Sequence, residues 1–124
     1  MKFHLSTAAG LMVTGTGPGW IRVGTTVYQE SMVLTPTEVK TGWGGAGFAG
    51  LTPADFEGLL ATDPEVVLLG TGRSLRFPHP RLSQALAKAG VGLEVMDTAA
   101  ACRTYNILAA EGRRVTAALL LEET

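Results

Sequence analysis

The side chains that could do chemistry gather in one stretch of this chain, from Glu94 to Val115. Asp97 follows an apolar run and precedes an alanine-rich segment, which is the pattern of a strand end and a helix start. A carboxylate, a thiol and a guanidinium close together could anchor a charged ligand or supply an acid, a base or a nucleophile. The first turns of the predicted helix carry the other members of this group: Thr98, Cys102, Arg103, Tyr105 and Asn106.

Helical spacing divides these side chains between two faces. Thr98, Cys102 and Tyr105 share one face at i, i+4 and i+7, whereas Arg103 and Asn106 share another.

Each reactive group also has a structural interpretation, which we favour. Asp97 would cap its own helix and pair with an arginine; a carboxylate poised in a ligand pocket is the alternative. Cys102 is favoured as a small buried side chain over a reactive thiol, because the sequence places no base beside it. We assign no catalytic residue, and no metal site, since His4, His79 and Cys102 lack the spacing of metal ligands.

A second polar stretch, Gly70-Thr-Gly-Arg-Ser74, directly follows the apolar run Glu65–Gly70. A dinucleotide fingerprint would need a glycine at position 75, which is leucine, and the Gly-Lys-Ser/Thr ending of a phosphate loop is absent. The sequence therefore predicts no nucleotide cofactor. A tight turn is the favoured interpretation, and an anion-binding nest of backbone N–H groups, with charge from Arg73, is the alternative.

Periodicity orders the elements that must position these groups. Residues 65–96 predict a strand, a crossover helix over 81–89 and a second strand, a unit that is almost always parallel and right-handed. Both strand ends and the start of the next helix then meet at one sheet edge, where open α/β sheets usually bind ligands. The candidate ligand-binding residues are those expected there: Gly70, Thr71, Gly72, Arg73, Asp97, Thr98, Arg103 and Asn106.

The remaining segments predict an α/β domain. Trp20–Val23 and Thr26–Leu34 flank Gly24-Thr25 as a β-hairpin, and Thr52-Pro-Ala-Asp55 has the form of a capped helix start. Residues 113–121 predict a final interior strand, because both of its faces are apolar. The aromatic residues Trp20, Trp43, Phe48 and Phe77 are expected in the core, and among them Trp43 is the best candidate for an exposed contact.

Composition bounds the function. The 124 residues suit a single domain over 1–124, and 46% hydrophobic with 17% charged residues favours burial partly against a protein partner, with homo-oligomerisation left open. A net charge of −1 without a basic stripe argues against nucleic acid. No apolar run approaches the roughly 20 residues of a membrane span, so direct membrane insertion is not expected. One cysteine and no Arg-rich presequence favour the cytoplasm.

Four blocks of sequence also carry a family resemblance: Gly15–Val23, Tyr28–Pro36, Leu69–Gly72 and, above all, Val95–Arg113. Across about residues 15–121 the chain resembles the domain-of-unknown-function family that includes mitochondrial complex I assembly factor 3 and the adipogenesis-associated protein. The resemblance implies a three-layer α/β domain with a mixed central sheet and no established enzymatic activity. It also implies a role by contact, since the mitochondrial relatives are similar to chaperone-like factors of respiratory-complex assembly.

Two functions of different classes follow. We favour a non-catalytic binding or assembly protein that assists a respiratory or membrane protein complex and needs no cofactor. The alternative is a binder of anionic small molecules, or an enzyme, that uses the crevice around Asp97 and Gly70–Arg73.

Overall fold

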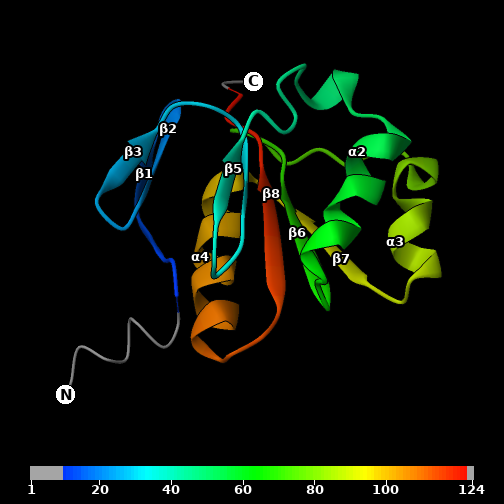
Figure 1. Ribbon diagram of the computed structural model, residues 1–124. Helices are drawn as coiled ribbons and strands as arrows, with labels where there is room; N and C mark the ends of the chain where they lie inside the picture. The colour runs from blue at the N-terminus through cyan, green and yellow to red at the C-terminus, as the bar shows by residue number, and fades with distance from the viewer. Residues whose placement is uncertain (1–9, 123–124) are drawn as a thin grey trace.

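A computed structural model describes residues 10–122 of the chain as an α/β domain with two sheets (Figure 1). Within that range the central sheet has the strand order β5-β4-β8-β6-β7, and a smaller sheet has the order β1-β2-β3. The strands are β1 (Val13–Gly17), β2 (Trp20–Val23), β3 (Thr26–Tyr28), β4 (Met32–Leu34), β5 (Val39–Thr41), β6 (Val66–Gly70), β7 (Gly92–Met96) and β8 (Val115–Leu119). The helices are α2 (Pro53–Glu57), α3 (Gln84–Lys88) and α4 (Thr98–Ala110), with 3-10 turns η1 (Phe48–Gly50), η2 (Gly58–Thr62) and η3 (Pro80–Ser83).

The central sheet is the middle of three layers. Figure 1 shows α2 and α3 over one face and α4 over the other, with the small sheet beside α4. Side chains of β6 alternate between the two interfaces: Leu68 packs with Tyr105 of α4, and Leu69 packs with Phe56 of α2. The three-layer fold with a mixed sheet and an N-terminal hairpin is therefore confirmed.

The two interior strands explain the long apolar runs in the sequence. Every residue of β6 and β8 is buried. β6 pairs in parallel with both β7 and β8, whereas β8 pairs antiparallel with β4. The predicted strand–helix–strand unit and the interior final strand are thus confirmed, and Gly70 and Met96 end at the same edge of the sheet.

Local end signals set the starts of α2 and α4 as expected, whereas the helix predicted over 81–89 is the 3-10 turn η3 followed by the shorter α3. Thr52 and Asp55 form a reciprocal capping box around Pro53, the first residue of α2. Helix α2 passes into η2, which ends at Asp63 in the left-handed conformation. Helix α4 begins after Asp97, whose side chain accepts a hydrogen bond from the Ala100 N–H.

One prediction for the N-terminal half was wrong. The run Thr26–Leu34 is not one strand: β3 pairs with β2, whereas β4 pairs with β5 and β8 in the other sheet. The chain crosses between sheets at Gln29–Ser31, where the Ser31 hydroxyl accepts a hydrogen bond from the Leu121 N–H. Gly15 and Gly17 belong to β1, and the turn to β2 lies at Pro18 and Gly19. The Trp20 indole lies over Gly17 and leaves no room there for a Cβ.

Candidate functional site at the carboxyl edge of the central sheet

Thr98 joins the end of β6 to the start of α4 and the end of β8. Its hydroxyl donates to the Leu120 carbonyl at 2.7 Å and accepts from the Gly72 N–H at 2.8 Å. Its own N–H donates to the Gly72 carbonyl at 2.9 Å. A Cβ on Gly70 would lie 2.9 Å from the Thr98 Cα, so the backbones of β6 and α4 approach too closely for any other residue at position 70.

The backbone N–H groups of the Gly70–Arg73 turn are engaged within the protein. The Thr71 N–H donates to the Met96 carbonyl, the Gly72 N–H to Thr98 and the Arg73 N–H to the Glu122 carbonyl. These three donors therefore bind the protein itself, and the geometry is that of a tight turn.

Asp97 caps α4, which confirms the first part of its favoured interpretation; the pairing with an arginine stays a prediction. Its Oδ1 accepts a hydrogen bond from the Ala100 N–H at 2.8 Å. The side chain is half-buried and also lines a cavity. Capping uses one oxygen of the carboxylate, and the same group therefore borders a space that a small ligand could enter.

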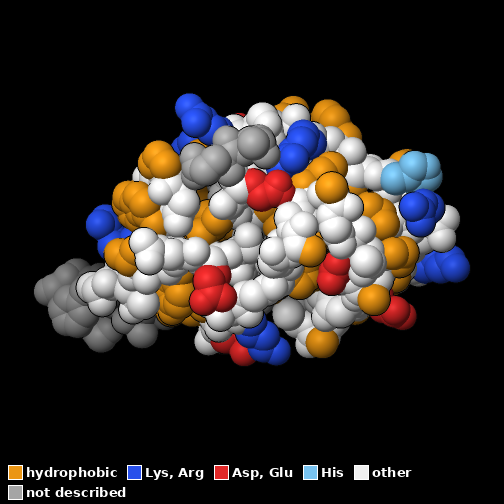
Figure 2. Space-filling model, turned by 90° about the horizontal axis from the view of Figure 1, so that it is seen from above, with side chains coloured by type: hydrophobic (Ala, Val, Ile, Leu, Met, Phe, Trp, Pro, Cys, Tyr) orange, Lys and Arg blue, Asp and Glu red, His pale blue; other side chains and the backbone are white. Residues whose placement is uncertain are grey.

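That cavity, about 240 Å³ in volume, lies between the β1–β2 turn and the start of α4. Pro18 and Trp20 form its apolar side, and Arg73, Asp97 and Glu122 bring charge to it. Figure 2 looks down on this edge of the molecule, where charged side chains of both signs lie among hydrophobic ones.

The predicted site residues divide into three groups. Gly72, Arg73, Asp97 and Thr98 line the cavity. Gly70 and Thr71 are buried and do not line it. Arg103 is exposed elsewhere on α4, and Asn106 holds the N-terminal strand.

The side-chain amide of Asn106 bonds to both backbone groups of Val13, as a neighbouring strand would. Its Oδ1 accepts from the Val13 N–H at 2.9 Å, and its Nδ2 donates to the Val13 carbonyl at 2.8 Å. The buried Tyr105 hydroxyl donates to the Leu11 carbonyl at 2.8 Å, and burial raises the pKa of this phenol. Both side chains therefore fix residues 11–13 against α4.

Cys102 is confirmed as a small buried side chain. It is only 2% exposed, and burial raises the pKa of its thiol to about 12, although the charge of Arg103 opposes the shift. The thiolate that a nucleophile needs is therefore scarce at neutral pH. His4 lies outside the described residues.

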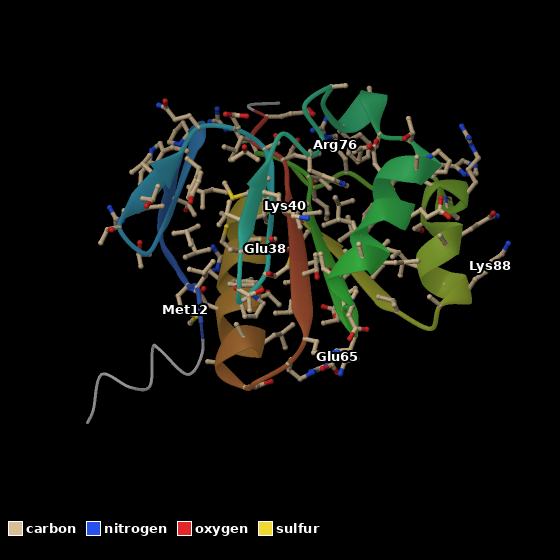
Figure 3. The ribbon with its side chains drawn as sticks, viewed as in Figure 1. Met12, Glu38, Lys40, Glu65, Arg76 and Lys88 are labelled. Atoms are coloured by element: carbon tan, nitrogen blue, oxygen red, sulfur yellow. The ribbon has the colours of Figure 1, made fainter. Side chains whose placement is uncertain are left out.

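An ion pair that the sequence did not indicate holds the loop after β6. Arg76 donates to the Glu122 carboxylate at 2.9 Å and to the Thr71 carbonyl at 2.8 Å, with its guanidinium 4.6 Å from the centre of the Phe48 ring (Figure 3). Burial opposes ionisation of Glu122, but the hydrogen bond from the Phe48 N–H and the Arg76 charge outweigh it, so its pKa lies below the ordinary value. Arg76, Glu122 and Phe48 are too distant from one another in the sequence for a local pattern to predict these contacts.

One prediction for the aromatic residues was wrong, that for Phe77. Trp43 is half-buried and packs against the core: its Nε1 donates to the Asp55 carbonyl at 3.0 Å, and its ring meets Phe56 edge to face. Phe77, predicted in the core, is 73% exposed, and Leu75 beside it is 51% exposed. Two large exposed apolar side chains therefore lie on the loop between β6 and η3.

Fold and site together define a class: a three-layer α/β domain with a small charged cavity at the sheet edge and a buried thiol. Residues 13–120 match the family described as protein of unknown function (DUF498/DUF598), and the chain belongs to this family. The resemblance found in the sequence is thereby confirmed.

Several relatives have names or structures. The mouse NADH dehydrogenase [ubiquinone] 1 alpha subcomplex assembly factor 3 is 34% identical over 104 residues, which are 82% of this chain and 55% of the mouse protein. The 13 kDa major membrane protein of Francisella tularensis is 39% identical over 62 residues, half of each protein. A crystal structure from Bordetella parapertussis has a TM-score of 0.81 at 41% identity and covers 90% of this chain and 96% of that one.

Two of these relatives invite a comparison with this chain, one in its length and one in its name as a membrane protein. The chain spans little more than half the length of the mouse assembly factor. In the part of the chain that the structure describes, no helix is long and apolar enough to cross a bilayer.

Proposed function

We propose that this protein is a non-catalytic binding factor that assists the assembly of a respiratory or membrane protein complex through direct contact with a protein partner. The observation that supports it most is the likeness, over 82% of this chain, to a mouse protein named as a complex I assembly factor. The buried thiol agrees with a role that needs no nucleophile. We place this role in the cytoplasm, the compartment that the single cysteine favours.

The contact surface that we propose is the loop 73–79, between the Gly70–Gly72 turn and η3. Large exposed apolar side chains such as Leu75 and Phe77 contribute most when a partner excludes water from them. The loop is braced at its base, because the Thr71 hydroxyl donates to the Ser74 carbonyl at 2.7 Å and accepts from the Arg76 N–H at 3.1 Å. A braced loop loses less conformational entropy when it binds.

Capture of partners from the native host tests this proposal. Wild-type protein should retain a subunit or assembly intermediate of a membrane complex, and the double variant Leu75→Ser/Phe77→Ser should lose it. The matched control is Val27→Ser/Ile107→Ser, which removes two side chains that are 53% and 59% exposed elsewhere on the surface. The proposal fails if no such subunit is retained, and the assigned surface is wrong if both double variants retain it equally.

The cavity supports a second candidate, a site for a small anionic ligand. Arg73 brings a positive charge to it, and α4 starts there with the positive end of its dipole. Asp97 and Glu122 on the same walls would select against multiply charged anions.

Thermal-shift measurements with a panel of small carboxylates and phosphates test this candidate. A genuine ligand should raise the melting temperature of the wild type and of Arg103→Ala, which lies outside the cavity, but not of Arg73→Ala. No shift with any compound, or equal shifts in all three proteins, would exclude the cavity as a site for an anionic ligand.

A further inference from the structure

We propose that the free edge of β7 binds an extended segment of a partner protein, which adds to the central sheet as a further strand. This inference rests on the proposed function, since it gives the partner a second contact in addition to the loop with Leu75 and Phe77. Strand addition of this type is a common mode of peptide recognition, with affinity from backbone hydrogen bonds and specificity from alternate side chains.

The hydrogen bonds of β7 show which of its backbone groups face outward. The Gly92 N–H donates to the Glu65 carbonyl at 3.3 Å, and the Met96 carbonyl accepts from Thr71 at 2.9 Å. The register between them is regular, so residues 92, 94 and 96 face β6. The N–H and C=O groups of Leu93 and Val95 therefore point away from the sheet, where no described strand pairs with them.

The other three edges of the two sheets are protected. β1 has an irregular register after Val13, whose N–H and C=O are covered by Asn106. β3 and β5 have only three residues each. β5 also carries the exposed Lys40, paired with Glu38 just before the strand (Figure 3).

β7 has only one of these protections, the exposed charge of Glu94. It has five residues, an even register and no proline. Natural proteins shorten, bulge, charge or cover such edges to prevent unwanted pairing. Because three edges are protected in these ways and β7 is left as a pairing surface with a single charge, we assign the recognition role to β7.

The side chains of β7 define the chemistry of its partner. Leu93 and Val95 are half-buried and pack with the α2/α3 side of the sheet, whereas Glu94 is exposed on the other face. The segment should therefore present apolar residues beside Leu93 and Val95 and a lysine or arginine beside Glu94.

A second copy of this chain fits the edge less well. The antiparallel register that uses the outward groups of Leu93 and Val95 in both copies has its centre at Glu94. Two Glu94 side chains would then face each other, and directly opposed like charges destabilise a strand pair.

A peptide titration followed by NMR tests the edge directly. The probe is an acetylated peptide of alternating Val and Lys, seven residues long, and the control peptide has Glu in place of Lys. The Val-Lys peptide should shift the amides of Leu93 and Val95 and slow their hydrogen exchange at least about tenfold. The Val-Glu peptide should bind roughly fivefold more weakly.

Three variants sharpen the result. Val95→Pro removes an outward N–H that β6 does not use, so the strand should persist while peptide binding is lost. Thr41→Pro is the control, because it makes the same change on the outer edge of β5. The hydrogen bonds of Thr35 and Gly42 show that the backbone groups of Lys40, not those of Thr41, face β4. Thr41→Pro should therefore leave peptide binding unchanged. Glu94→Lys should reverse the preference and favour the Val-Glu peptide, which keeps the test valid if Val95→Pro fails to fold.

Each outcome is decisive. Unperturbed Leu93 and Val95 amides at saturating Val-Lys peptide overturn the proposal. If both amides are protected by self-association in the absence of peptide, the edge binds a second copy of this chain and not a partner segment. If Val95→Pro still restores complex assembly in a deletion strain, the edge is not the contact although the assembly role holds; if wild type does not restore assembly, the proposed function fails whatever the peptide does.

Discussion

The turn Gly70–Gly72 and the loop that follows it differ sharply, although they are adjacent in the chain. The turn is buried and its polar groups are engaged with Met96, Thr98 and Leu120. The loop presents Leu75 and Phe77 to solvent from a base braced by Arg76. The polar groups of the turn therefore hold the fold together, whereas two apolar side chains of the loop are exposed, which suits the partner contact that we propose.

The largest expected effect is on the turn. Gly70→Ala would place a Cβ against the Thr98 backbone, and such overpacking should lower the free energy of unfolding by about 3 kcal/mol. Urea denaturation measures the loss. Gly58→Ala is the control, because Gly58 has helical dihedral angles and open space around it, so it should be neutral or stabilising by up to about 1 kcal/mol. Equal effects of the two changes would contradict the close approach at Gly70.

A somewhat smaller effect should follow from removing the hydroxyl at the junction. Thr98→Val keeps the side-chain shape but leaves the Gly72 N–H and the Leu120 carbonyl without their partner, which should cost about 2 kcal/mol. Thr26→Val on the exposed β3 is the matched change and should cost less than about 0.5 kcal/mol. A Thr98→Val protein as stable as the wild type would show that these hydrogen bonds matter little.

The ion pair between Arg76 and Glu122 should make a pH-dependent contribution to the free energy of unfolding. The side chains of Arg76 and Glu122 are 30% and 22% exposed, so Glu122→Gln should lose only about 1 kcal/mol near neutral pH. Because the pKa of Glu122 is lowered in the folded state from 4.5, its contribution is present above about pH 4.5 and disappears as the pH falls through the folded value. The urea midpoints of wild type and variant should therefore converge as the pH is lowered below 4.5; a constant difference would contradict the ion pair.

The smallest effect on stability should come from the exposed loop. Leu75→Ser/Phe77→Ser should change the free energy of unfolding by less than about 0.5 kcal/mol, because neither side chain is buried. The same variant should lose its captured partner. A large loss of stability, measured by urea denaturation, would mean that these side chains pack in solution.

Much of the fold was predictable because its signals are local. The capping box at Thr52, the cap at Asp97 and the apolar runs of β6 and β8 each fix an element within a few residues. The split of Thr26–Leu34 between two sheets was not predictable, since it depends on the long-range hydrogen bond from the Leu121 N–H to the Ser31 hydroxyl.

The site was predictable to the same extent. The meeting of the Gly70 turn with Asp97 and Thr98 follows from the parallel topology of β6 and β7. Long-range partners decided the rest: Asn106 pairs with Val13, and Arg76 joins Phe48 to Glu122. The exposure of Phe77 is a matter of loop path, which apolar character alone does not reveal.

The central claim is that the protein acts through its loop surface and not through chemistry in the crevice. Complex assembly in a deletion strain tests it most directly, with native gels comparing Leu75→Ser/Phe77→Ser and Asp97→Asn at equal levels of folded protein. Asp97→Asn removes the charge that borders the cavity and keeps a residue that caps helices well. We predict that the loop variant fails to restore the assembled complex and that Asp97→Asn restores it; the reverse result would contradict the account.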